Sequence, residues 1–114
     1  MPQNVHRMTS NATTTNATLV KAGPGRVFKI RGYTGAPALR YLKIYNMESV
    51  PVVGTNKPLM TIPLRPSMEF DIDFGRYGLV CDVGIAFAIT TGVSDLDATA
   101  LTVNDVVGLN IIFE

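Results

Sequence analysis

Cysteine, histidine and tryptophan are nearly absent from this sequence. Cys81 and His6 are the only residues of their kinds, and there is no tryptophan. A single cysteine excludes an internal disulfide framework, and one cysteine with one histidine is too few for a structural zinc site. We therefore expect one hydrophobic core to hold the 114-residue chain together, which a chain of this length can bury without covalent or metal staples.

Charge is scarce as well. Charged residues make up 17% of the chain, against about a quarter of an average soluble domain. The net charge of +1 gives no field that would steer nucleic acid or an anionic membrane. No apolar run reaches the roughly 18 residues of a membrane span, and the N-terminus has no signal-peptide pattern. We therefore expect no nucleic-acid or membrane partner, but surplus apolar surface that meets another protein chain.

The first residues differ in composition from the rest of the chain. Residues 1–16 are rich in Asn, Thr and Ser and offer little to bury, so they cannot repay the entropy of ordering by themselves. We predict a flexible N-terminal arm over residues 1–16, either frayed or ordered against a neighbouring subunit. Residues 17–114 are predicted to form one domain.

Within residues 17–114, short alternating segments are separated by turn residues such as the Gly-Pro-Gly at 23–25. About seven or eight strands at roughly ten-residue spacing predict an all-β, single-domain antiparallel sandwich or barrel. Residues 36–47 also fit a helix, but their aromatic and β-branched residues favour a strand. Pro63 cannot donate to a strand ladder, which predicts a place at a sheet edge or a bulge.

One predicted strand has two unusual faces. Between residues 79 and 90, large residues alternate with small ones, and the small side includes Gly84, Ala86 and Ala88. A face of small residues can be approached closely by other backbone. Either a loop such as 93–105 covers it within one chain, or three copies pack there along a symmetry axis.

Candidate catalytic and metal-binding residues are few. His6 lies in the predicted arm, where a general base has no fixed position. Cys81 shares a strand face with apolar residues, which favours a buried thiol, and the adjacent Asp82 opposes formation of a thiolate. Glu69, Asp71 and Asp73 form an acidic row that supplies at most three calcium ligands from one strand. We predict a solvated face there, or one that meets Arg26, Lys29 and Arg31 of a neighbouring subunit. We expect no enzyme activity, metal or cofactor.

Four segments, taken together and in order, give the chain a resemblance to a known family. They are GPGRVFKIRGY (23–33), RYLKIYN (40–46), VPVVGTNKPLMTIPLRP (50–66) and GIAFAITTGVSDLDATALTVNDVVGLNI (84–111). Their turn residues and strand rhythm resemble small virion structural proteins of tailed bacteriophages, most of all capsid decoration (cement) proteins. The chain departs from that pattern at the charged EFDID (69–73) and at Asn104, which stands where the pattern has a turn glycine.

The resemblance implies a non-enzymatic protein on the capsid surface of a virion, with a jelly-roll-like β-sandwich that binds the major capsid protein as a homotrimer. For the capsid contact we predict the arm (1–16) and four residues of the long loop: Val50, Pro51, Val53 and Lys57. For contact between copies we predict five residues: Tyr41, Tyr45, Gly84, Ala86 and Ala88. The alternative is a tail-fibre or baseplate-associated β module that binds a host receptor.

Overall fold

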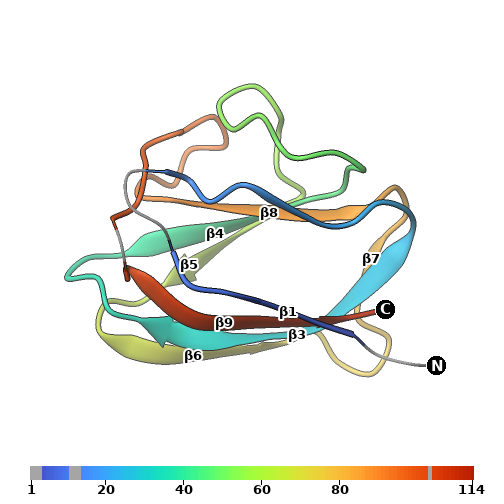
Figure 1. Ribbon diagram of the computed structural model, residues 1–114, viewed down its shortest axis with the longest axis horizontal. Coiled ribbons are helices and arrows are strands. Elements are labelled where there is room, and N and C mark those ends of the chain that lie inside the picture. Colours follow the sequence, from blue (N-terminus) through green and yellow to red (C-terminus); the bar gives the residue numbers. More distant parts are fainter. Residues whose placement is uncertain (1–3, 11–13, 103) are drawn as a thin grey trace.

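The computed structural model describes residues 4–10, 14–102 and 104–114, and these form two antiparallel sheets (Figure 1). The nine strands are β1 (Asn4–Met8), β2 (Thr18–Lys21), β3 (Gly25–Thr34), β4 (Arg40–Tyr45), β5 (Met60–Leu64), β6 (Met68–Asp73), β7 (Leu79–Cys81), β8 (Ile85–Thr90) and β9 (Val106–Phe113). The predicted all-β sandwich is confirmed. In the part of the chain that the structure describes, no helix has the length and hydrophobicity of a membrane crossing.

The strand order is that of a jelly roll. The first sheet runs β1-β9-β3-β6, with β7 also paired to β3, and the second runs β2-β8-β4-β5. The antiparallel pairs are nested, as if one long hairpin had been rolled into two sheets. They are β1 with β9, β2 with β8, β3 with β6 and β7, and β4 with β5. Pro63 lies in β5 at the edge of the second sheet, as its missing N–H predicts.

The main core fills the space between the sheets. Its buried residues come from both inner faces: Val27, Ile30, Leu42, Ile44, Leu64, Cys81, Ile85, Phe87, Ile89, Leu101, Val106, Leu109 and Ile111. Most alternate with outward-facing neighbours along their strands, which is the pattern that the sequence shows. Cys81 is fully buried among them, as expected for a small hydrophobic residue.

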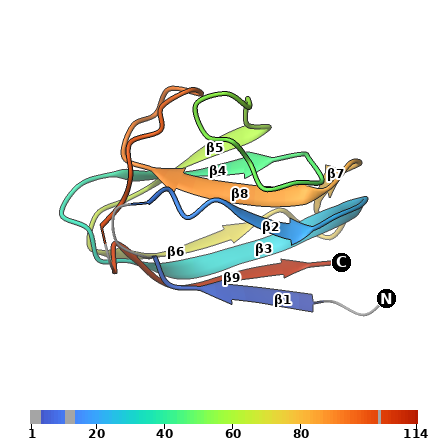
Figure 2. The ribbon, with the colours of Figure 1, turned by 45° about the horizontal axis from the view of Figure 1, so that its top comes forward.

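Loops cover the outer face of the second sheet, so this sandwich has a third layer. Residues 46–59, between β4 and β5, and residues 91–102, after β8, lie over β4 and β8 in both views (Figures 1 and 2). Every residue of β8 is therefore buried. Ala86 and Ala88 are 0% exposed and pack with Tyr45 in a second cluster, against side chains that include Met47 and Val53. A loop cover within the chain thus explains the small-residue face.

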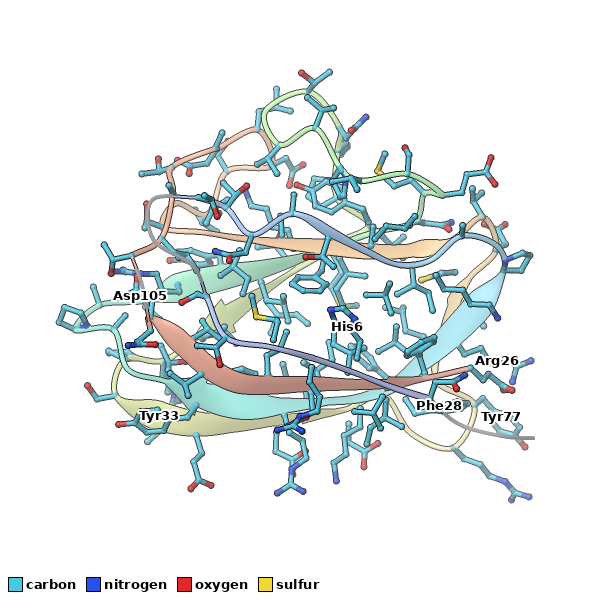
Figure 3. The ribbon with its side chains drawn as sticks, viewed as in Figure 1. His6, Arg26, Phe28, Tyr33, Tyr77 and Asp105 are labelled. Carbon is cyan, nitrogen blue, oxygen red and sulfur yellow. The ribbon has the colours of Figure 1, made fainter. Side chains whose placement is uncertain are left out.

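The first residues form part of the sandwich rather than a separate arm. β1 pairs with β9 over its whole length, and the His6 ring meets the Phe87 ring edge-on with 5.8 Å between centroids (Figure 3). Ser10 is buried, and its backbone N–H donates to the carbonyl of Val106. The predicted boundary at residue 17 is therefore corrected for the described residues 4–10 and 14–16. Residues 1–3 and 11–13 of the predicted arm lie outside the described residues.

The outer face of the first sheet carries charges of both signs. Asp71 on β6 lies 3.5 Å from the Lys29 ammonium and 3.6 Å from the Arg31 guanidinium, both on the neighbouring β3. Asp71 of the acidic row thus meets basic residues of its own chain. Such pairs are exposed and contribute little to stability, about 0–1 kcal/mol each.

Candidate functional site

The long loop of residues 46–59 contains the four residues predicted to contact a capsid, and the structure separates them. Val50 and Lys57 are exposed, whereas Pro51 is buried and Val53 packs inward against Tyr45, Ala86 and Ala88. Pro51 and Val53 therefore anchor the loop to the sheet. Sequence reasoning missed Val52, which is 60% exposed.

Val52 is held outward by a hydrogen-bonded turn. Its carbonyl accepts from the backbone N–H groups of Thr55 (3.0 Å) and Asn56 (2.9 Å). Its own N–H donates to the side-chain oxygen of Asn56 at 2.7 Å. Hydrogen bonds thus hold both the N–H and the carbonyl of Val52, while the Val53 side chain is directed into the cluster beneath. An apolar side chain is presented to solvent from a backbone that has little freedom to move.

The second covering loop, residues 91–102, also presents apolar side chains to solvent. Val93 is 61% exposed and Leu96 is 55% exposed. The Asp97 N–H donates to the Ser94 carbonyl at 2.9 Å, which closes a turn with Asp95 and Leu96 at its corners.

Lys43 holds this turn from below. Lys43 is 0% exposed on β4 and its Nζ donates to the carbonyl oxygens of Ser94 (2.6 Å) and Asp97 (3.0 Å). Burial lowers the pKa of Lys43, while the nearby charges of Asp97 and Asp95 act to raise it. The backbone hydrogen bond from Thr99 holds the pKa of the Asp97 carboxyl below its ordinary value.

The two loops touch each other on the outer side of the second sheet (Figures 1 and 2). A Cβ built on Gly54 would lie 3.5 Å from the Ala98 side chain and 3.7 Å from the Leu96 carbonyl oxygen, so residue 54 lies against the second loop. We call the four most exposed of the large apolar side chains on these loops, Val50, Val52, Val93 and Leu96, the loop face. The exposed residues Glu48, Asp95 and Lys57 belong to the same loops.

A buried ion pair fixes the end of the second loop to β4. The Arg40 Nε donates to the Asp105 Oδ2 at 2.9 Å, and both side chains are largely buried. The backbone N–H and hydroxyl of Thr102 also donate to the Asp105 carboxylate. Burial acts to raise the pKa of Asp105, but these hydrogen bonds and the Arg40 charge hold it below its ordinary value.

The residues predicted for contact between copies are mostly inside the chain. Tyr45, Ala86 and Ala88 are buried against Met47 and Val53 of the 46–59 loop and against Ala17 and Leu19. Gly84 is buried too, where an added Cβ would meet the carbonyl oxygens of Met47 and Lys21. Tyr41 is half-buried. The prediction is thus corrected for four residues, because a second copy could reach them only if the loops moved away.

His6, Cys81 and the acidic row are the remaining candidates for catalysis or metal binding. Within the described ranges, no group of three or more His, Cys, Asp or Glu side chains lies close enough together to hold a metal ion. Burial, with the adjacent Asp82 charge, raises the pKa of the Cys81 thiol, which disfavours the nucleophilic thiolate.

His6 is predicted to make the attachment of β1 sensitive to acid. Burial lowers the pKa of His6, so the unfolded chain binds its proton before the folded chain does. The free energy of unfolding should therefore be highest above a pH of about 6.5 and decrease as the pH falls toward the folded pKa. Denaturant unfolding at pH 7 and pH 5 measures this. The change should shrink in His6→Phe, and an equal change in both proteins would contradict it.

Comparisons with known proteins find little similarity. No protein-family model matches the sequence, and no curated protein sequence matches it either. Among solved structures, the chain is similar to the coat protein of Tobacco streak virus, with a TM-score of 0.41 and 9% sequence identity. That match covers 98% of this chain and 85% of the coat protein. Because the TM-score is below 0.5, the function proposed below rests on the chain's own residues.

Proposed function

We propose that this chain is a non-enzymatic virion structural protein, a capsid decoration (cement) protein of a tailed bacteriophage. The loop face carries the proposal: two touching loops present Val50, Val52, Val93 and Leu96 to solvent from one side of the sandwich. Contact with neighbouring subunits of the major capsid protein through this face would bind those subunits together and stabilise the head.

The construction of the loop face suits it to lasting contact. Exposed apolar side chains that gather in one place indicate an interaction surface more than scattered ones do. The Val52 and Leu96 turns are closed by hydrogen bonds in the free chain, so little conformational entropy remains to be lost on binding. An apolar centre of this kind, with charged residues beside it, resembles the usual anatomy of a protein–protein interface.

The jelly roll is compatible with this role but does not decide it. Viral capsid proteins use this fold, as do lectins and cupins, so function must be argued from surfaces. The two outer sides of this sandwich differ. The loop side carries the loop face beside Glu48, Lys57 and Asp95. The first sheet presents the ion pairs of Asp71 to water, together with scattered exposed apolar residues such as Val5 and Val80. With the loop side on the shell, the charged sheet would face solvent.

We further propose that the protein binds as a homotrimer. Three loop faces that engage neighbouring sites at once would give high avidity from modest single contacts. The small-residue face of β8 does not supply the contact between copies, because loops of the same chain cover it. Light scattering of the purified protein should give three times the chain mass. A monomer both in solution and on the shell would overturn the trimer.

The receptor-binding alternative has one observation in its favour. A shallow groove of about 390 Å³ on the open first sheet is lined by residues that include Tyr33, Arg31, Glu69 and Asn110. Tyr33 is exposed there (Figure 3), and an exposed aromatic ring beside polar groups suits a polar receptor such as a glycan. Binding to host cells that is lost in Tyr33→Ala but kept in loop-face variants would favour this function.

The decisive variants for the decoration role place a charge in the loop face. Val52→Asp and Leu96→Asp should each weaken binding to capsid shells by at least about tenfold, because an unpaired carboxylate must then be desolvated at an apolar contact. Sedimentation of the protein with shells assembled without it measures the affinity.

Val5→Asp is the matched control, because Val5 is 57% exposed on β1, in the opposite sheet. It should bind shells like the unchanged protein. Full binding by both loop-face variants, or a loss in Val5→Asp alone, would contradict the assigned surface. An unchanged protein that does not bind shells would contradict the decoration function itself.

A further inference from the structure

We infer that Lys43 is a positioning residue for the loop face: its buried ammonium is an internal cation around which residues 94–97 fold. The inference rests on the proposed function for its binding consequence. Its structural part, that the ammonium fixes the turn bearing Leu96, stands on contacts within the chain.

The position of Lys43 in the sheet is unusual for a lysine. It lies in the middle of β4, paired with Thr61 on β5 and with Ala88 on β8, on the face that the loops cover. Lysine is almost never fully buried unless its charge is paired, because the ammonium must leave water. Lys43 is nevertheless 0% exposed. Its ammonium therefore depends on hydrogen-bond acceptors from the covering loop, residues 91–102.

The loop supplies backbone carbonyls rather than a carboxylate. The acceptors are the Ser94 and Asp97 carbonyl oxygens, at 2.6 Å and 3.0 Å. In the described part of the chain, the ion pairs join Lys29 and Arg31 to Asp71 and Arg40 to Asp105, and Lys43 is not among them. The Asp97 carboxylate instead accepts from the N–H and hydroxyl of Thr99.

Backbone acceptors make the ammonium a constraint on loop shape. A salt bridge to a side chain would leave the backbone free to move, but these two carbonyls flank Asp95 and Leu96 directly. The Ser94 carbonyl also accepts from the Asp97 N–H, so one turn hydrogen bond and two charge-assisted bonds converge on four residues. The turn is thereby drawn down onto the sheet, and its exposed corner carries Leu96.

Lys43 thus has the same role beneath this loop that the Asn56 side chain has in the first loop. Asn56 closes the Val52 turn through the Val52 N–H, and Lys43 closes the Leu96 turn through two carbonyls. Loss of the Lys43 ammonium should leave the strands paired but release the 94–97 turn. Binding then has to order this turn again, which lowers affinity without removing any contact residue.

The test compares Lys43→Met with Lys29→Met, which removes the same charge from β3, in the sheet opposite the loop face. In Lys43→Met, amide hydrogen exchange in residues 94–99 should be faster by at least about tenfold, since charge-assisted hydrogen bonds to the turn are lost, with the β4 and β8 amides still protected. Its affinity for shells should fall by about fivefold or more through the entropy of reordering. Lys29→Met should change neither quantity. Unchanged protection of residues 94–99 in Lys43→Met would overturn the inference.

A measurement on the unchanged protein tests the inference even if Lys43→Met fails to fold. In ¹⁵N NMR spectra, the Lys43 ammonium should give a signal whose protons exchange slowly with water, because it is buried and hydrogen-bonded. Rapid exchange like that of the surface lysines would overturn the inference. If the unchanged protein does not bind shells, the decoration function fails, whereas the exchange and NMR results still decide the role of Lys43 in the loop.

Discussion

Replacement of Asp105 by alanine should lower the free energy of unfolding by about 3–5 kcal/mol, as expected when one partner of a buried ion pair is removed. The Arg40 guanidinium would stay largely buried opposite an empty space, since only 13% of its side chain is exposed. The N–H and hydroxyl of Thr102 would lose their acceptor at the same time. Denaturant unfolding followed by circular dichroism measures the change.

Asp71→Ala is the matched control for this prediction. Asp71 also contacts two basic side chains, but it is 49% exposed and the closest of its two contacts is 3.5 Å long. Its replacement should cost less than about 1 kcal/mol, as is usual for surface ion pairs. Equal effects at the two positions would show that burial of the Arg40–Asp105 pair is not what makes it important.

Replacement of Gly84 by alanine should lower the free energy of unfolding by about 3 kcal/mol, the upper end of the usual range for overpacked sites. The added Cβ would meet the carbonyl oxygens of Met47 and Lys21, which belong to the loop cover and to β2. Backbone atoms of two other segments cannot turn aside as a flexible side chain can. The base of the 46–59 loop must therefore shift.

This second prediction has two readouts. Denaturant unfolding gives the loss of stability, and amide exchange in residues 46–56 should become faster because the loop no longer seats on β8. A Gly84→Ala protein within about 0.5 kcal/mol of the original, the range of ordinary surface substitutions, would mean that the small-residue face does not require the close approach seen at Gly84.

The β-sandwich could be predicted because alternation and turn residues are local signals. The Gly-Pro-Gly turn at 23–25 and Pro63 at a sheet edge occur as the sequence indicates. The single strand predicted between residues 79 and 90 is wrong, because the chain divides there into β7 and β8, which belong to different sheets. β1 was missed because Asn4–Met8 is short and mostly polar. Its ordering comes from β9, about a hundred residues further along the chain, which local composition does not reveal.

The residues of the candidate site were harder to predict, because burial there depends on distant loops. Lys43 in a strand normally indicates a water-facing side, yet Ser94 and Asp97 cover it. The small face of β8 fitted both a loop cover and a second copy, and the low charge of the chain favoured the second copy. Met47 and Val53, which pack against that face, decide for the loop. In an irregular loop no periodicity separates Val52, which points outward, from Val53, which points inward.

The most direct test of the docking surface is crosslinking on assembled particles. A photoreactive amino acid is placed at residue 52 in one protein and at residue 5 in another, and each is bound to capsid shells and irradiated. We predict an adduct with the major capsid protein from residue 52 and none from residue 5. An adduct from residue 5 alone would show that the charged sheet, rather than the loop face, lies against the shell.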